Sequence, residues 1–403
     1  MKSNWEFFTS GRIVFGTGSL RKLAPALREM NAKNVLVVTD PGIVRAGLAE
    51  KALELMEPFD VIVYDRVIPE PPADSVLDCC RFAAGRNIDA VIGFGGGSSI
   101  DMAKMAAALL KYGGHPLDYF GGGNRIPGPI TPVIAIPTTA GTGSEATSVA
   151  VLTDTANNVK IGISDRHLVP ALSIVDPELT LGLPPYVTAC TGMDALAHAI
   201  EAYTAKPYND YPPDEDLIFQ GSAPISDALA LRAIELIADN LAAAVRFGGN
   251  LEARSRMMLG STLAGMAFAN AGTALAHAFG YPIGGLVKRP HGEITGLMLP
   301  YVMAYNASVQ PEKMRTVARL FGVNPAGLSG KEFALSAARA VFRLLAEIGL
   351  PTRLGQIGIE AKHIPEIAEK TLGIGRLVRN NPRTPNREDL EKLLNQALRG
   401  ELA

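Results

Sequence analysis

Several residue types that mark whole classes of protein are scarce in this chain of 403 residues. Its three cysteines, Cys79, Cys80 and Cys190, have no CxxC spacing, which argues against a disulfide framework or a thiolate zinc site. The net charge of −2 argues against a nucleic-acid partner. No run reaches the roughly 18 apolar residues of a membrane span, and the N-terminus lacks the apolar segment of a signal peptide. We therefore expect a soluble, cytoplasmic protein with no membrane partner.

The chain is too long for one hydrophobic core, so two domains are expected. In its first part, short β-branched runs alternate with helical patterns, which predicts a parallel α/β sheet covered by helices on both faces. The predicted strands are residues 34–40, 60–65, 89–97, 132–139 and 172–176.

The pattern changes after the proline pair at 184–185. Long Ala- and Leu-rich helical patterns follow, and strand-like runs almost vanish. We predict an α/β domain over residues 1–183 and an all-α domain over residues 184–403. A polar, proline-rich insertion at 206–222 is long for a connection between two helices.

A glycine-rich turn joins a predicted strand to a predicted helix in DAVIGFGGGSSIDMAK, residues 89–104. Glycine lets the backbone approach a ligand closely, and the first N–H groups of a helix favour phosphate. The turn departs from the usual dinucleotide fingerprint, because reading from Gly93 gives GxGxxS. A tight structural turn also uses glycine, but three in a row favour phosphate binding.

Two further features favour a nucleotide in the same domain. The loop IPTTAGTGSEAT (136–147) follows a strand and offers hydroxyl and amide groups, although an ordinary loop does so too. Asp40 ends the first predicted strand, where an acid can bind ribose hydroxyls and select NAD over NADP; a capping role is equally common there. The glycine-rich turn and the 136–147 loop are both expected at the carboxyl edge of the sheet, where such folds bind ligands.

Histidine is also rare, with six in the chain. Three of the six, together with one aspartate, lie in two apolar stretches and are possible metal ligands. In GMDALAHAIEAY, Asp194 and His198 are spaced i, i+4 and share one face of a helix. In ALAHAFGYPIGGLVKRPHGE, His277 and His291 flank a glycine-rich segment. A polar group in an apolar setting needs a partner. One carboxylate and three imidazoles suit Fe(II) or Zn(II), and the ligand types alone do not choose between them.

Four motifs in order, GFGGGSSIDMAK, IPTTAGTGSEAT, GMDALAHAIEAY and HAFGYPIGGLVKRPHGE, resemble the signatures of the iron-containing (group III) alcohol dehydrogenases. The resemblance extends over essentially the whole chain. It implies a nucleotide-binding domain, a helical metal-binding domain, an active site in the cleft between them and at least a homodimer. It also implies that Asp194, His198, His277 and His291 bind the metal.

The resemblance further implies contacts to NAD(H) and to the substrate. The expected NAD contacts are Asp40, Gly96, Gly97, Ser98, Asp101, Thr138, Thr139, Ser144, Lys160 and Leu179. Phe268 matches an aromatic residue of the family's substrate pocket, although a core phenylalanine is the simpler interpretation. Lys288 and Arg289 could attract an anionic substrate or form a solvated turn, and Arg376, Arg379 and Arg383 have the same two interpretations.

One position departs from the family pattern. Many members have a histidine four residues after the third ligand, where this chain has Tyr281, which we treat as a candidate catalytic residue. Tyr281 and the FQGSAPISDALA segment resemble the hydroxyacid–oxoacid transhydrogenase branch, which moves a hydride between two small acids. A lyase similar to dehydroquinate synthase is the alternative of another class, but its metal set has a glutamate and two histidines.

The expected reaction follows from this combination. The hydroxyl of a small alcohol would bind the divalent metal as Lewis acid, and the carbinol carbon would pass hydride to nicotinamide, giving an aldehyde or ketone.

Overall fold

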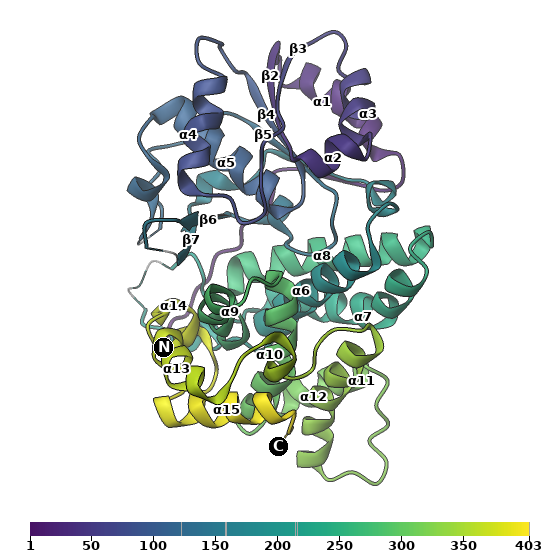
Figure 1. Cartoon of the computed structure of the whole chain (residues 1–403), viewed down its shortest axis with the longest axis vertical. Coiled ribbons are helices and arrows are strands. Elements are labelled where there is room, and N and C mark those ends of the chain that lie inside the picture. The colour runs from purple at the N-terminus through teal and green to yellow at the C-terminus, as the bar shows by residue number, and fades with distance from the viewer. Residues whose placement is uncertain (122, 158, 214, 216, 403) are drawn as a thin grey trace. The chain divides into compact units, whose positions relative to one another are not determined.

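The computed structural model describes residues 1–121, 123–157, 159–213, 215 and 217–402, and divides into two compact units (Figure 1). One unit is Phe8–Leu183, and the other is Pro184–Ala403 together with Met1–Phe7. Residues 1–7 thus belong to the helical unit and not to the α/β domain predicted over 1–183. Hydrogen bonds to the helical unit hold these residues there: the Glu6 N–H donates to Gln220 Oε1 at 2.8 Å, and Lys2 Nζ donates to the carbonyl of Glu215 at 3.1 Å.

A six-stranded sheet in the order β1-β8-β5-β4-β2-β3 forms the centre of the α/β unit, and all its strand pairs are parallel. Its strands are β1 (Ile13–Phe15), β2 (Asn34–Val38), β3 (Asp60–Tyr64), β4 (Ala90–Gly95), β5 (Val133–Pro137) and β8 (Leu172–Val175). All five predicted strands are therefore confirmed. The sequence did not reveal β1, because three residues are too few to show a period.

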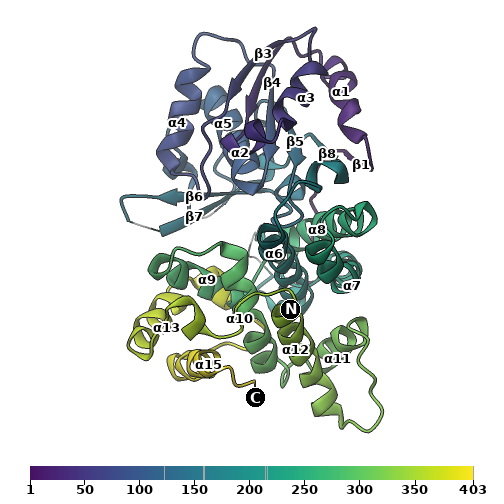
Figure 2. The ribbon, with the colours of Figure 1, turned by 45° about the vertical axis from the view of Figure 1, so that its right-hand side comes forward.

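Helices cover both faces of this sheet, as the strand–helix alternation predicts (Figures 1 and 2). The first helices are η1 (Ser19–Lys22), α1 (Leu23–Glu29), α2 (Pro41–Arg45), α3 (Leu48–Glu54), α4 (Ala73–Phe82) and α5 (Gly97–Tyr112). The short 3-10 helices are η2 (Pro116–Tyr119), η3 (Ser144–Ala146), η4 (Arg166–Leu168) and η5 (Pro177–Thr180). Neighbouring residues of one strand point to opposite faces, so Val37 packs with α1 and α3 while Val38 packs with α4 and α5.

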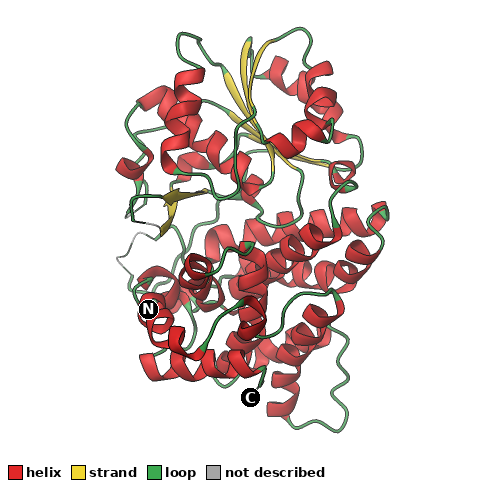
Figure 3. Cartoon of the chain, in the orientation of Figure 1, coloured by secondary structure: helices red, strands yellow, loops and turns green. Residues whose placement is uncertain are grey.

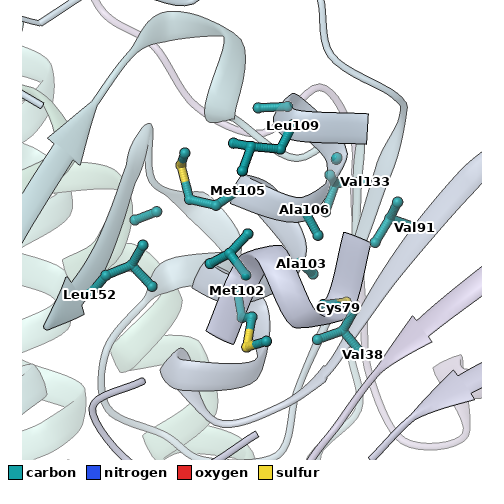
Figure 4. Close-up of a cluster of buried hydrophobic side chains, with 14 of the residues drawn as sticks. Val38, Cys79, Val91, Met102, Ala103, Met105, Ala106, Leu109, Val133 and Leu152 are labelled. Atoms are coloured by element: carbon teal, nitrogen blue, oxygen red, sulfur yellow. The ribbon is translucent and has the colours of Figure 1, made fainter. Parts of the chain in front are cut away.

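The hydrophobic core on the α4 and α5 face of the sheet contains most of helix α5, which carries the glycine-rich turn at its start (Figure 4). Met102, Met105 and Leu109 of this helix pack with Val91 and Val133 of the strands beneath it. An antiparallel hairpin of β6 (Val149–Asp154) and β7 (Val159–Ser164) covers the other side of α5. The sequence analysis did not identify this hairpin. Its packing on α5 helps to hold this helix, and the glycine-rich turn at its start, in place.

The second unit is helical, as predicted (Figure 3). Its main helices are α6 (Pro185–Thr204), α7 (Pro224–Arg246), α8 (Leu251–Ala271), α9 (Leu275–Leu286), α10 (His291–Asn306), α11 (Pro311–Leu320), α12 (Gly330–Glu347), α13 (Ile364–Leu372), α14 (Gly375–Asn380) and α15 (Arg387–Arg399). Its 3-10 helices are η6 (Tyr208–Asp210), η7 (Leu354–Ile357) and η8 (Ala361–His363). Within the described residues after 183, β pairing is limited to the isolated bridge between Pro207 and Ser222.

No helix in the described part of the chain is both long and apolar enough to cross a membrane. Within the insertion at 206–222, positions 214 and 216 lie outside the described residues. The rest of the insertion is tied down at both ends. The Lys206 N–H donates to the carbonyl of Asn380 at 2.8 Å, and the Ser222 N–H donates to the carbonyl of Lys206 at 2.9 Å.

Candidate functional site

Three side chains that are far apart in the sequence meet in the helical unit. One ligand atom from each of Asp194, His277 and His291 lies within 4.8 Å of the other two. Asp194 comes from α6, His277 from α9, and His291 is the first residue of α10. Asp194 and His277 are buried, with exposed fractions of 5% and 4%. A carboxylate and two imidazoles at this spacing form a candidate site for a divalent cation.

The surroundings of His277 Nε2 indicate whether these residues fit a metal ion. His277 Nε2 is buried and has no hydrogen-bond partner within the described residues; Asp194 Oδ1 lies 3.9 Å away. Leaving a buried polar atom without a partner costs about 1–3 kcal/mol, which coordination to a cation would remove. The donor set and this nitrogen both fit a divalent metal ion.

His198 is the fourth expected ligand, and it lies beside the three others. Its ring stacks on His277 with centroids 4.6 Å apart, and its other neighbour is Phe268, at 4.1 Å with nearly parallel rings. Within the described residues, the group of ligand atoms that lie within 4.8 Å of one another contains Asp194, His277 and His291 but not His198. The structure thus brings all four together and also places Phe268, the expected substrate-pocket aromatic, directly against His198.

Glu201 is a candidate functional residue that the sequence analysis missed. Its Oε2 accepts a hydrogen bond from His277 Nδ1 at 2.6 Å and from the Ala274 N–H at 2.9 Å, and its Oε1 accepts from the Ala276 N–H at 2.6 Å. Because the carboxylate accepts, Nδ1 carries the proton and the Nε2 lone pair of His277 is left for a cation. The signal was available: Asp194, His198 and Glu201 recur at helical spacing along one face of α6.

The charge of Asp194 is set by opposing effects. Burial alone would raise the pKa of Asp194, but its electrostatic interactions with the imidazoles of His198, His291 and His277 act against it. A hydrogen bond from Thr295 Oγ1 at 3.1 Å adds to this, and the pKa of the carboxyl falls below its usual value. The carboxylate is therefore ionised at neutral pH, as a cation ligand must be.

Two glycines explain why these elements can approach. A Cβ on Gly292 would lie 2.2 Å from the carbonyl oxygen of Cys190 and 2.8 Å from Asp194 Cβ, so only glycine lets α10 start against α6. A Cβ on Gly280 would lie 3.0 Å from His291 Cε1. The glycines of the AFGYP and PHGE segments thus make room for the imidazole and the carboxylate.

The other expected side chains near this group differ in their surroundings. The ring of Tyr281 lies 6.1 Å from that of His291, and burial raises the pKa of its hydroxyl, which therefore stays neutral. Lys288 is exposed, in the turn between α9 and α10. Arg289 has an internal partner, because its Nη1 lies 3.7 Å from Oε1 of the buried Glu293.

In the α/β unit, the two predicted nucleotide loops lie side by side. β4 and β5 pair in the sheet, and the Thr138 N–H donates to the carbonyl of Gly95 at 2.9 Å. A Cβ on Gly97 would lie 2.6 Å from Thr142 Cγ2, and one on Gly96 would lie 3.6 Å from Thr139 Oγ1. Bare backbone therefore lines the turn between β4 and α5, which is what close approach of a pyrophosphate requires.

Asp40 is a helix cap, which is one of the two interpretations that the sequence left open. Its Oδ1 caps helix α2 by accepting from the N–H groups of Gly42 and Ile43 at 2.8 and 3.2 Å. Its Oδ2 accepts a longer hydrogen bond, of 3.4 Å, from Ser99 Oγ and faces Gly95 in the glycine-rich turn. One oxygen is thus used for folding while the other lies next to the expected ligand position.

Other expected NAD contacts have strong internal partners. The carboxylate of Asp101 accepts from Ser144 Oγ and, at 2.9 Å, from the Val151 N–H. Ser144 Oγ in turn accepts from the fully buried Lys104 Nζ at 3.0 Å. These bonds tie the second loop and β6 to α5, which is a positioning role. Leu179, with 6% exposed, packs into the hydrophobic core beneath η5.

Lys160 and Ser98 are linked through Glu70. Lys160 Nζ forms an ion pair of 2.5 Å with Glu70 Oε1, and the Glu70 N–H donates to Ser98 Oγ at 3.2 Å. This chain of contacts holds the β6–β7 hairpin to the first turn of α5. Without it, a lysine in an edge hairpin would have no fixed relation to the glycine-rich turn.

The chain matches known proteins over nearly its full length. Residues 10–177 match the sequence model of the iron-containing alcohol dehydrogenases, and residues 188–398 match that of the C-terminal part of the Fe-containing alcohol dehydrogenase family. The NAD-dependent methanol dehydrogenase of Bacillus methanolicus is 36% identical, with 98% of this chain and 100% of that protein covered. The mitochondrial hydroxyacid-oxoacid transhydrogenase of Mus musculus is 35% identical, with 96% and 89% covered.

A solved structure agrees with these matches. The crystal structure of a 1,3-propanediol oxidoreductase superposes with a TM-score of 0.91 at 35% identity, covering 98% of this chain and 100% of the other. The chain therefore belongs to the iron-containing alcohol dehydrogenase family.

Proposed function

We propose that the protein is an iron- and NAD(H)-dependent oxidoreductase that interconverts a small alcohol and its aldehyde or ketone. The observation that carries the proposal is the group of Asp194, His277 and His291, in which the His277 Nε2 atom is buried and lacks a partner within the described residues. The family to which the chain belongs supplies the choice of iron, and Zn(II) is the alternative ion for the same donors.

The residues of the candidate metal site would have different roles in the reaction. Asp194, His277 and His291 would hold the ion, with His198 beside them. Bound there, a divalent cation supplies Lewis acidity to a hydroxyl or carbonyl oxygen, while the nicotinamide donates or accepts the hydride. The Asp194 carboxylate contributes negative charge, and Glu201 keeps His277 in the tautomer whose Nε2 can coordinate. Phe268, whose ring stacks on His198, would offer apolar surface to the carbon chain of a substrate.

For the cofactor, the backbone N–H groups at the start of α5 would bind the pyrophosphate, next to Gly96 and Gly97. Asp40, whose Oδ2 faces the turn, would accept from the ribose hydroxyls and repel a 2′-phosphate, which favours NAD over NADP. The name of the methanol dehydrogenase relative states the same cofactor preference for that protein.

Anaerobic loading with Fe(II) and a panel of small alcohols tests this proposal. We expect NADH formation, followed by its absorbance, with at least one alcohol, and loss of activity on chelation that Fe(II) restores. NADP should be used poorly. An enzyme that keeps full activity after its metal has been removed would contradict the proposal.

Hydroxyacid–oxoacid transhydrogenase activity is the second candidate, favoured by 35% identity to such an enzyme over 96% of this chain. The distinguishing assay supplies 4-hydroxybutyrate and 2-oxoglutarate without free NAD. Formation of the semialdehyde under these conditions would identify a transhydrogenase, and formation only with added NAD would identify a dehydrogenase. We also propose that the enzyme is cytoplasmic, has no nucleic-acid partner and forms a homodimer or larger homo-oligomer. Light scattering of the purified protein measures the size of the assembly.

A further inference from the structure

Five cationic side chains were candidates for binding an anionic substrate, and the structure separates them by their partners. These side chains are Lys288, Arg289, Arg376, Arg379 and Arg383. Arg289 pairs with Glu293, Arg379 with Glu215 at 3.0 Å, and Arg383 with Asp389 at 3.2 Å. A carboxylate partner satisfies part of the hydrogen-bonding capacity of each of these guanidinium groups.

Arg376 has no such partner. Within the described residues, its guanidinium makes no ion pair and no hydrogen bond to a protein group, and the residue is exposed. It is held from one face, because its Cζ lies 4.5 Å from the centroid of the Phe219 ring. A ring against the face of a guanidinium leaves the N–H groups at its edge free for a planar anion such as a carboxylate. Among the residues that the structure describes, Lys288 also has no ion-pair partner, but no cation–π contact holds it.

The backbone around Arg376 and Phe219 is anchored. Asn380, on the same helix α14, donates from Nδ2 to the carbonyls of Ala271 and Thr273, both at 3.0 Å. Next to Phe219, the Gln220 N–H donates to the carbonyl of Asn270 at 2.7 Å. The end of the 206–222 insertion and helix α14 are thus both fixed to the junction of α8 and α9. This gives the insertion a role, which is to supply the ring beneath the arginine.

Arg376 lies on a helix that packs against part of the candidate metal group, which is Asp194, His277 and His291. Helix α14 packs against α9, which carries His277 and Tyr281. Arg376 interacts electrostatically with Tyr281: burial is the larger effect and raises the pKa of Tyr281, while the guanidinium lowers it. The ring of Tyr281 in turn lies 6.1 Å from that of His291. Tyr281 thus interacts electrostatically with Arg376, and its ring lies near that of His291, a candidate metal ligand.

We propose that Arg376 binds an anionic group at the far end of the substrate, so that the preferred substrates are small hydroxy acids and their aldehyde acids. The reacting oxygen would lie at the Asp194–His277–His291 group and the carboxylate at Arg376. This inference rests on the proposed function, since it assumes that the alcohol or aldehyde reacts at that group.

The test compares an aldehyde acid with its neutral ester. Succinic semialdehyde and methyl 4-oxobutanoate share the reacting aldehyde and differ in the charge at the other end. With Fe(II)-loaded full-length protein and NADH, we expect kcat/KM for the acid to exceed that for the ester. In Arg376→Gln this ratio should fall roughly 10- to 100-fold, the size of a charge-assisted hydrogen bond. Arg376→Lys should fall between the two, because an ammonium lacks the planar fork.

Arg379→Gln is the matched control, since Arg379 lies on the same short helix but already pairs with Glu215. Its acid-to-ester ratio should stay at the wild-type value. A purely structural role of Arg376 would lower kcat/KM for both substrates and leave their ratio unchanged. An unchanged ratio in Arg376→Gln, or no preference for the acid in the wild type, would overturn the inference.

Failure of the proposed function has a different signature. If the wild type reduces neither aldehyde, the proposed function fails, and binding of 4-hydroxybutyrate, measured by saturation-transfer NMR, decides on Arg376. Binding that weakens in Arg376→Gln but not in Arg379→Gln supports the anion site. Equal binding by both variants, or no binding to the wild type, contradicts it.

Discussion

The helical unit and the α/β unit offer a ligand different chemical groups. In the helical unit, side chains converge: Asp194, His277 and His291 place possible ligand atoms together, and Glu201 forms a hydrogen bond with His277. In the α/β unit, the glycine-rich turn offers bare backbone, while nearby polar side chains such as Asp101 and Ser144 bond to one another. One candidate site is thus made by side chains that converge from three helices, and the other by a backbone that internal side-chain bonds hold in shape.

The largest expected effect comes from removing a side chain of the metal group. His277→Ala should lose bound metal and lower kcat/KM roughly 1000-fold, because Lewis-acid stabilisation is worth several kcal/mol. Metal analysis and NADH formation on the same sample measure both. His363→Ala is the control, since His363 lies in the short helix η8, where its ring accepts a hydrogen bond from the Glu360 N–H. Full metal content in His277→Ala would contradict the assignment.

Glu201→Gln should weaken metal binding without removing a ligand. A glutamine has one acceptor oxygen, so its NH₂ group would face at least one of the donors on Ala274, Ala276 and His277 that now meet the carboxylate. We expect the Kd for Zn(II), measured by competition with a chelating dye, to rise roughly 10- to 100-fold.

Glu252→Gln, which changes an exposed carboxylate of α8 paired with Arg256, serves as the control for charge. Thermal unfolding of the metal-free proteins separates loss of fold from loss of affinity. If Glu201→Gln binds Zn(II) as tightly as the wild type, Glu201 has no positioning role.

A substitution in the glycine-rich turn should affect the cofactor and spare the metal. Gly97→Ala places a methyl group against Thr142, and the resulting shift of the turn should raise the KM for NAD roughly 10-fold. Metal content should not change. Adding Thr142→Ala removes the closest contacts and should restore part of the affinity. A normal KM for NAD in Gly97→Ala would show that the turn does not bind the cofactor.

The smallest functional effect is expected at Leu179. Because this side chain packs in the core, Leu179→Ala should lower the free energy of unfolding by about 3 kcal/mol and leave the KM for NAD unchanged. Denaturant unfolding and steady-state kinetics measure the two quantities. A raised KM with undiminished stability would instead favour the NAD contact that the family resemblance implies.

The same contrast explains what the sequence could predict. Hydrophobic runs and their alternation with helices predicted the parallel sheet and the helical unit, because both depend on burial patterns that are local in sequence. The short strand β1 and the β6–β7 hairpin were missed. β1 pairs only with β8, and the hairpin is stabilised largely by packing on α5, so neither has a strong local signal.

For the metal group, residue type and spacing were sufficient to name its side chains, which remain predictions as ligands. Glu201 was missed although it lies on the same helical face, because its partners Ala274 and His277 come from a distant part of the chain. The role of Arg376 depends on which of several arginines lacks a carboxylate partner. Only three-dimensional structure shows that difference.

Titration of the metal-free protein with Fe(II) tests the central claim most directly. At saturating NAD and alcohol, with protein well above the Kd for iron, we expect activity to rise linearly and level off at one Fe(II) per chain. His277→Ala should show no such break. Full activity before any Fe(II) is added, or an identical titration in His277→Ala, would contradict the account.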